Sequence, residues 1–306
     1  MFAASGPVKP FPLEEEYKKK TRVTPEDIKK LRAWLETQPH LPAEHITDLD
    51  LILTFHCVNR SAEVAKQVLD LHFTLKTLFT SFFKDRKVDD KILKTMSTYA
   101  LTPLETRAYD DSAIIYCGLV DYDPKNFVFA DAVRACLMVL DLWQYSAGTW
   151  PGFVIVIDLD HATISHITRL DVQSVQQFLY FLQEAMLLKI KSLHFLNAPS
   201  FMDRLMMILR PFLKKELLDM LSIHQIGSTT IGKFFPIEAL PKDAGGQYKT
   251  RQQCRDDVIE KFTSTKEFFV EENKKRVVEA KRPGKPKTIS DIFGGVEGSF
   301  KKLDID

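Results

Sequence analysis

The sequence has few cysteines, and these lie far apart. Only four of its 306 residues are cysteine (Cys57, Cys117, Cys136 and Cys254), and no two of them form a CxxC pair or another metal-ligand spacing. This distribution argues against a disulfide-stapled secreted scaffold and against a cysteine-based metal site. It predicts reduced, partly buried thiols of a cytosolic protein.

Long apolar runs and a strong net charge are also missing. No stretch approaches the roughly 18 uninterrupted apolar residues that cross a bilayer. The N-terminal MFAASGPVKPFPLEEE has no apolar core and so does not read as a signal peptide. The net charge of +1 provides no global field for nonspecific nucleic-acid binding. We therefore expect a cytoplasmic chain without a nucleic-acid partner, whose basic surface is local.

Motifs for nucleotide binding and nucleophilic catalysis are absent. The chain has no G-x-S-x-G, no G-x-G-x-x-G after a strand and no G-x-x-x-x-G-K-[ST]. His161 and His166 lie five positions apart, which lacks the i, i+4 spacing of a helical zinc pair and favours packing or solvent roles. We predict no catalytic residue, no metal and no cofactor, with a lipid-modifying enzyme as the least favoured alternative.

The first hundred residues have helical periodicity. Thr24 followed by Pro25 and two acidic residues is a good helix start. Further helices are expected near residues 47–56 and 61–80. This pattern predicts an N-terminal helical bundle over residues 12–95.

The period changes after Leu101. Short β-branched segments bounded by turn residues predict strands at 113–122 and 152–158, and weaker patterns predict strands at 192–197 and 222–226. Apolar helical stripes predict helices near 129–146, 171–188 and 200–220. This alternation predicts an α/β fold with a mostly parallel sheet covered by helices, over residues 96–250. An amphipathic helix near 255–280 and a tail make up residues 251–306.

The segment 200–221 is unusually apolar and carries four of the eight methionines. At 100° per residue, one arc of roughly 160° holds Phe201, Met202, Leu205, Met206, Ile208, Leu209, Phe212 and Leu213. Pro211 predicts a bend or break. Two interpretations are open, a half-buried helix packed on the sheet or a movable lid over an apolar cavity. The width of the arc, its methionines and the bend favour the lid.

Neighbouring helices carry further apolar stripes, which form either a rich core or the walls of a pocket. Basic residues lie close to the apolar segment in sequence: Lys189, Lys191, Arg210, Lys214 and Lys215. Each alone is expected to be a solvated surface residue. Beside an apolar lid, they would instead attract anionic lipid headgroups at about 1 kcal/mol per charge.

Several spaced landmarks occur in a familiar order. They are Tyr122-Asp123-Pro124, Asp131 with Arg134, Asp158, Leu188-Lys189-Ile190-Lys191, Leu196-Asn197-Ala198-Pro199, and Leu240-Pro241 followed by Gly245-Gly246. With them, residues 12–275 resemble the CRAL-TRIO (Sec14-like) lipid-binding family. The resemblance is greatest to its retinaldehyde-binding and tocopherol-transfer branch, particularly the insect members. Departures include Cys136 and Leu140 at positions that are serine in the tocopherol carriers, and Glu216 and Met220 at phosphoinositide-binding positions.

The resemblance implies a monomeric cytosolic carrier without enzymatic activity, associated peripherally with membranes. It would enclose one tocopherol-, retinoid-, carotenoid- or terpenoid-like molecule and exchange it with membranes. The alternative is a phosphoinositide-sensing or partner-docking membrane module with little transfer. The implied cavity is lined by Val133, Cys136, Leu137, Leu140, Ile155, Phe178, Phe181, Leu182, Met186, Leu193, Met202, Leu205, Met206 and Leu209. The implied membrane contacts of the lid are Phe201, Ile208, Phe212 and Leu213, and the anionic headgroup would meet Lys189, Lys191, Arg210, Lys214 and Lys215.

Overall fold

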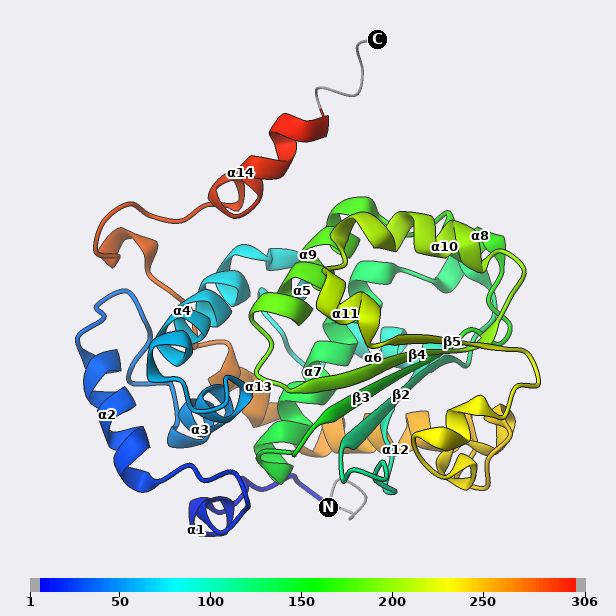
Figure 1. Ribbon diagram of the computed structural model, residues 1–306, viewed down its shortest axis with the longest axis horizontal. Coiled ribbons are helices and arrows are strands. Elements are labelled where there is room, and N and C mark those ends of the chain that lie inside the picture. The colour runs from blue at the N-terminus through cyan, green and yellow to red at the C-terminus, as the bar shows by residue number, and fades with distance from the viewer. Residues whose placement is uncertain (1–5, 301–306) are drawn as a thin grey trace.

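A group of helices and a five-stranded sheet make up the fold, as seen in a computed structural model that describes residues 6–300, with side chains up to residue 294 (Figure 1). The first residues of the N-terminal segment and residues 301–306 of the predicted tail lie outside the described residues. The predicted α/β fold class is confirmed, with a helical bundle followed by a mostly parallel sheet.

Helices form the N-terminal part of the chain. They are α1 (Leu13–Tyr17), α2 (Pro25–Glu36), α3 (Asp48–Cys57), α4 (Ala62–Leu78), α5 (Thr80–Phe83) and α6 (Asp90–Thr98). Thr24 caps α2 in a reciprocal capping box with Asp27, and Thr47 does the same for α3 with Asp50, which explains where both helices begin. The bundle has its own core, whereas Ile92 of α6 packs in the core of the sheet.

The sheet has the order β1-β2-β3-β4-β5. Its strands are β1 (Tyr99–Pro103), β2 (Ala113–Leu119), β3 (Phe153–Asp158), β4 (Ile190–Ala198) and β5 (Leu221–Gln225). The strands β2 to β5 are parallel, and β1 pairs antiparallel with β2. The sequence analysis did not predict β1, because every residue of this short strand is buried and no period-2 alternation marks it.

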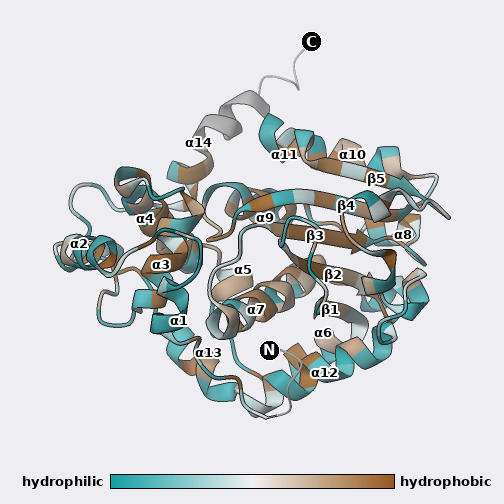
Figure 2. Cartoon of the chain, turned by 60° about the horizontal axis from the view of Figure 1, so that its bottom comes forward, coloured by the Kyte–Doolittle hydropathy of each residue, from teal (hydrophilic) through white to brown (hydrophobic). Residues whose placement is uncertain are grey.

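The two faces of the sheet are covered by different parts of the chain (Figure 2). Ile115, Ile155 and Leu193 face the cluster that includes α7 (Phe129–Ala147), α9 (Val172–Glu184) and α10 (Met202–Leu209). Ile114 and Val154 face the other side, which is covered by residues of the 3₁₀ helices between 230 and 244. Because α7, α9 and α10 all lie over one face, a site between helices and sheet is restricted to that face.

Two predicted helices are shorter than expected. The segment 200–220 is divided into α10, a 3₁₀ turn (Arg210–Phe212) and α11 (Lys215–Asp219), which confirms the expected break near Pro211. The predicted helix 255–280 is two helices, α12 (Arg251–Ser264) and α13 (Lys266–Glu272). Phe262 and Phe269 from this pair are fully buried in the sheet's core, so the C-terminal helices are part of the packed body. The short α8 (Ile164–Ile167) follows β3, and α14 spans Ile289–Phe300.

A pair of buried histidines joins β4 to β5. His194 Nδ1 lies 3.0 Å from His224 Nε2, and His224 Nδ1 lies 2.7 Å from the Thr230 hydroxyl. Burial lowers the pKa of His194 to about 4 and that of His224 in the same direction. The folded protein therefore binds fewer protons than the unfolded chain between pH 6.5 and about 4, and the free energy of unfolding should fall as the pH falls through this window.

We expect a loss of a few kcal/mol over that window, at about 1.4 kcal/mol per pKa unit. Urea denaturation at a series of pH values measures it, and His194→Gln should flatten the dependence. A profile that is unchanged in this variant would assign the acid sensitivity to other groups.

Candidate functional site

An apolar cavity lies between the sheet face and the helices α7, α9 and α10. Its volume is about 240 Å³. This is slightly below the range of roughly 300–1,000 Å³ for pockets of drug-sized ligands. The wall is almost entirely hydrocarbon, and strands and helices far apart in the sequence contribute to it.

Most of the predicted cavity residues line this space. The structure brings together Val133, Cys136, Leu140, Ile155, Phe178, Leu182, Met186, Leu193, Leu205 and Leu209. The sequence analysis missed the strand and loop residues that complete the wall, among them Tyr99, Leu101, Ile115, Phe127 and His166. The sequence holds no signal for Ile115, because its strand is apolar on both faces and a period of 2 does not say which face meets the helices.

Four predicted cavity residues lie elsewhere. Leu137 and Phe181 pack with Leu75, Phe79 and Phe83 in a cluster between the sheet domain and the N-terminal helices. Met202 and Met206 of α10 are buried in the main core but do not line the cavity. Each belongs to an apolar stripe wide enough to face two neighbours, and the expected assignment to the cavity is wrong for these positions.

The outer surface of α10 differs from the expectation in one residue. Phe201, Ile208 and Phe212 are partly exposed, in keeping with a surface position. Leu213, expected to contact a membrane, is instead buried and lines the cavity, because the chain is extended there and no longer follows the helical arc. The most exposed apolar side chain of α10 is Met207, at 70%.

Gln183 of α9 holds the segment that follows α10. Its amide Nε2 donates to the Phe212 carbonyl at 2.9 Å, and its Oε1 accepts from the Lys214 backbone N–H at 2.8 Å. The Lys214 ammonium also pairs with Glu184. The Gln183 side chain thus fastens the chain between α10 and α11 to α9, a helix of the cavity wall.

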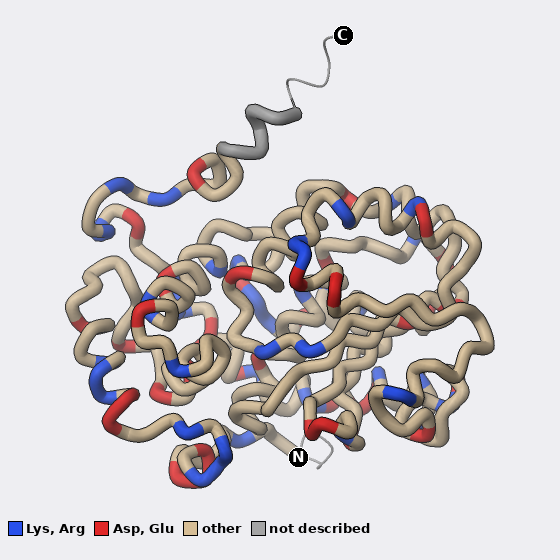
Figure 3. The backbone as a smooth tube through the Cα atoms, in the orientation of Figure 1, with Lys and Arg blue, Asp and Glu red and all other residues tan. Residues whose placement is uncertain are grey.

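The predicted headgroup cations are exposed or partly exposed, but two of them have acidic partners. Lys214 pairs with Glu184, and Lys215 lies 2.5 Å from Asp219. Figure 3 shows basic and acidic positions side by side along α11. Lys189 and Lys191 precede and begin β4, and Arg210 follows α10. Because β4 and β5 are parallel, Lys191 and α11 lie at the same edge of the sheet.

The carboxylate that lines the cavity is fully engaged. Asp158 accepts hydrogen bonds from the Tyr116 hydroxyl (2.5 Å), the Asn197 amide (2.8 Å) and Arg251 (2.8 Å). Arg251 Nε donates to the Tyr116 hydroxyl at 2.9 Å, and burial together with the Asp158 charge raises the pKa of Tyr116. This network fastens α12 to β2 and β3.

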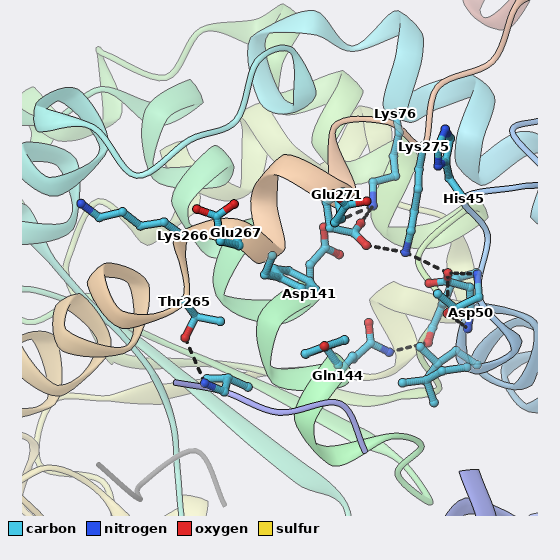
Figure 4. A pocket seen from close by; sticks show the side chains of 18 of the residues that line it. His45, Asp50, Lys76, Asp141, Gln144, Thr265, Lys266, Glu267, Glu271 and Lys275 are labelled. Carbon is cyan, nitrogen blue, oxygen red and sulfur yellow. Dashed lines mark hydrogen bonds and ion pairs between the residues drawn. The ribbon is translucent and has the colours of Figure 1, made fainter. Parts of the chain in front are cut away.

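A second pocket is polar and differs from the apolar cavity. It has a volume of about 630 Å³ and lies beside α3, α4, α7 and α13 (Figure 4). Lys76 pairs with Asp141 (3.2 Å) and Glu272 (3.1 Å), and Lys275 pairs with Asp50 (2.8 Å) and Glu272. Burial alone would raise the pKa of Glu272, but the surrounding cations outweigh burial and lower it. These charges satisfy one another, so this pocket reads as structural.

None of the helices among the described residues is both long and apolar enough to span a membrane. Within the same part of the chain, no group of three or more His, Cys, Asp or Glu side chains is arranged to hold a metal ion.

Comparison with known proteins gives two family matches. Residues 98–246 match the family described as CRAL/TRIO domain, and residues 20–93 match the family described as Pinta-like, UBA domain. The chain is similar to clavesin-1 of Xenopus laevis, with 22% identity over 72% of this chain and 67% of that protein. It is 24% identical to clavesin-1 of Rattus norvegicus, over 72% of this chain and 63% of that protein.

Human clavesin-2 is 21% identical over 91% of this chain and 87% of its own length. The solved structure titled "Crystal structure of Sfh5" covers 94% of this chain and 97% of that chain, at 10% identity and with a TM-score of 0.41. The residues that match the CRAL/TRIO domain contain the five strands of the sheet and the residues that line the apolar cavity. Residues 98–246 of this chain are accordingly similar to the CRAL/TRIO domain.

Proposed function

We propose that the protein is a lipid carrier that binds one hydrophobic molecule in the apolar cavity under α10 and transfers it between membranes. The observation that supports this most directly is the apolar space itself, which is lined by the sheet and three helices. The ligand is a tocopherol-, retinoid-, carotenoid- or terpenoid-like molecule. Membrane association is peripheral, and no chemical step is part of the function.

The free energy of moving an apolar ligand into water explains why a carrier is needed. Each buried CH₂ gains about 0.8 kcal/mol on leaving water, so a long apolar ligand escapes through water very slowly. Moving it from a bilayer into an apolar cavity is close to neutral, because both surroundings are hydrocarbon-like. The barrier is then the opening of the cavity, and the segment from α10 to Leu213 is its lid because Leu205, Leu209 and Leu213 cover the ligand space.

The outer face of the lid is suited to membrane contact. Met207 is well exposed, and Phe201, Ile208 and Phe212 are accessible in part. Insertion of these side chains into a bilayer would replace the contacts that α10 loses on opening. Lys191, Lys189 and Arg210 supply the attraction to anionic lipid, while Lys214 and Lys215 contribute less because each has an acidic partner.

A vesicle assay tests the carrier proposal. The chain is mixed with phosphatidylcholine vesicles that carry labelled tocopherol, retinal, β-carotene or a terpenoid, repurified and measured by native mass spectrometry. The expected result is one bound molecule per chain, and faster movement of that ligand to acceptor vesicles when the protein is present. Tight vesicle association without extraction of any of these probes would favour the alternative, a membrane-docking module with little transfer.

Loosening the lid's attachment should accelerate exchange. Gln183→Ala removes hydrogen bonds to Phe212 and Lys214, each with a net value of about 0.5–1.5 kcal/mol. We expect ligand release to acceptor vesicles to become about tenfold faster, since the bonds are lost in the closed state only. Stopped-flow transfer measures this rate, with Gln173→Ala, at an exposed position of the same helix, as the control. Equal rates in both variants would mean that the lid does not open at this attachment.

A further inference from the structure

One polar group in the wall of the apolar cavity has no partner. His166 of α8 lines the cavity and is 3% exposed. Its Nε2 is buried and has no hydrogen-bond partner among the described residues. A buried polar group without a partner costs free energy, so such an atom calls for an explanation.

The protonation state of this imidazole is determined by its other nitrogen. Nδ1 lies 3.1 Å from the Thr163 backbone nitrogen, whose N–H donates to it, and 2.9 Å from the Thr163 hydroxyl. Burial lowers the pKa of His166 from its ordinary value of 6.5, which favours the neutral ring at neutral pH. Because Nδ1 is an acceptor, the single ring proton is on Nε2, which is therefore a hydrogen-bond donor.

The other polar side chains of the cavity wall already have partners. Asp158 is saturated by Tyr116, Asn197 and Arg251. The Tyr99 hydroxyl oxygen accepts from the Val128 N–H at 3.3 Å, and the thiols of Cys117 and Cys136 in the wall are only weak donors. His166 thus differs from the rest of the wall in presenting a donor with no acceptor.

The position of His166 also gives the bound molecule a direction. α8 follows β3, so His166 lies at the carboxyl edge of the sheet. Leu213, which lines the cavity too, comes after α10 and before β5, near the opposite edge. The donor is therefore at one end of the cavity, and the segment fastened by Gln183 is toward the other end.

We propose that His166 is the polar anchor of the cavity and donates a hydrogen bond from Nε2 to an oxygen of the ligand, which makes the ligand class an apolar chain or ring system with a terminal carbonyl, ether or hydroxyl oxygen. This inference rests on the carrier function proposed above and narrows its ligand class. The oxygen lies at the α8 end and the hydrocarbon tail extends toward Leu213. A pure hydrocarbon fits the wall but leaves Nε2 unpaired.

The test compares two probes that differ in this oxygen. Farnesal is an apolar aldehyde, and farnesene is a hydrocarbon with the same carbon skeleton. We expect wild-type protein to bind farnesal about tenfold more tightly than farnesene, measured by native mass spectrometry titration. In His166→Phe this preference should disappear while farnesene binding is retained. His45→Phe, at a partly exposed histidine outside the apolar cavity, should keep the preference.

His166→Phe also removes the acceptor of the Thr163 N–H and could disturb the local fold. A second measurement therefore uses the wild-type protein alone. The infrared carbonyl stretch of bound farnesal should lie below its frequency in hydrocarbon solvent, as hydrogen bonding to the carbonyl requires. An unshifted carbonyl, or equal affinity of wild-type protein for the two probes, would overturn the anchor and leave the carrier function standing. If wild-type protein binds neither these probes nor any lipid in the vesicle assay, the carrier proposal fails and the anchor with it.

Discussion

Filling the cavity should abolish ligand binding while the fold persists. Ala132 of α7 lines the space, and so does Leu209 of α10. In Ala132→Trp or Leu209→Trp an indole would occupy volume that the ligand needs. Excluding even four methylenes from burial costs about 3 kcal/mol, which corresponds to a loss of affinity of roughly a hundredfold. The two substitutions lie on separate helices, so the same result in both would not depend on one local rearrangement.

Titration with the ligand recovered by the vesicle assay measures this loss. Val172→Trp on α9 is the matched control, because Val172 is 56% exposed and outside the cavity wall. Circular dichroism and urea denaturation check the fold, since overpacking costs typically 1–3 kcal/mol. Undiminished binding in both cavity variants, with the fold intact, would place the ligand somewhere other than this space.

The volume of the cavity bears on how the lid works. At about 240 Å³ the closed space is small for a drug-sized ligand. A larger molecule fits only if part of the wall moves outward. The segment from α10 to Leu213 suits this movement, because it is interrupted by a 3₁₀ turn at Pro211 and its far end is held by the side chain of Gln183. Under the proposed carrier function, ligand size and lid position would therefore be coupled.

The sequence predicted where helices and strands lie better than it predicted which of their apolar side chains contact which neighbour. Strands β2 and β3 follow from short β-branched runs, β4 and β5 from weaker patterns, and helices α7, α9 and α10 from the apolar helical stripes that alternate with them. The strand β1 has no such signature, since it is short and buried throughout. The C-terminal helix was predicted as one segment, and the break at Thr265 between α12 and α13 carries no proline or glycine to signal it.

The sequence predicted which face of each helix is buried. It did not predict which residues of that face line the cavity and which pack against another neighbour. On α7, Cys136 and Leu140 line the cavity, whereas Leu137 packs toward the N-terminal helices. On α10, Leu205 and Leu209 line it at i, i+4 spacing, and Met206 does not. A helix with a wide apolar stripe contacts two neighbours, and periodicity gives the width of the stripe without saying which row meets which neighbour. His166 was expected to have a packing or solvent role, because spacing alone does not show an unpaired Nε2.

The buried arginine that fastens α12 should be essential for stability. Arg251 is 2% exposed and pairs with Asp158 (2.8 Å) and Asp160 (2.9 Å), and it donates to the Tyr116 hydroxyl. In Arg251→Met the Asp158 carboxylate would remain buried without its countercharge. Removing one partner of a buried pair typically costs about 3–5 kcal/mol. We expect a decrease of this size in the free energy of unfolding, measured by urea denaturation.

Arg255→Met on the same helix is the matched control. Arg255 pairs with Asp256, a carboxylate that is 57% exposed, and pairs with such exposed partners are worth about 0–1 kcal/mol. If Arg251→Met cost no more than Arg255→Met, the network around Asp158 would not be what fastens α12 to the sheet. The double variant Arg251→Met with Asp158→Asn sharpens the test: removing both charges should recover part of the loss, because the penalty of Arg251→Met comes from the carboxylate left without a partner.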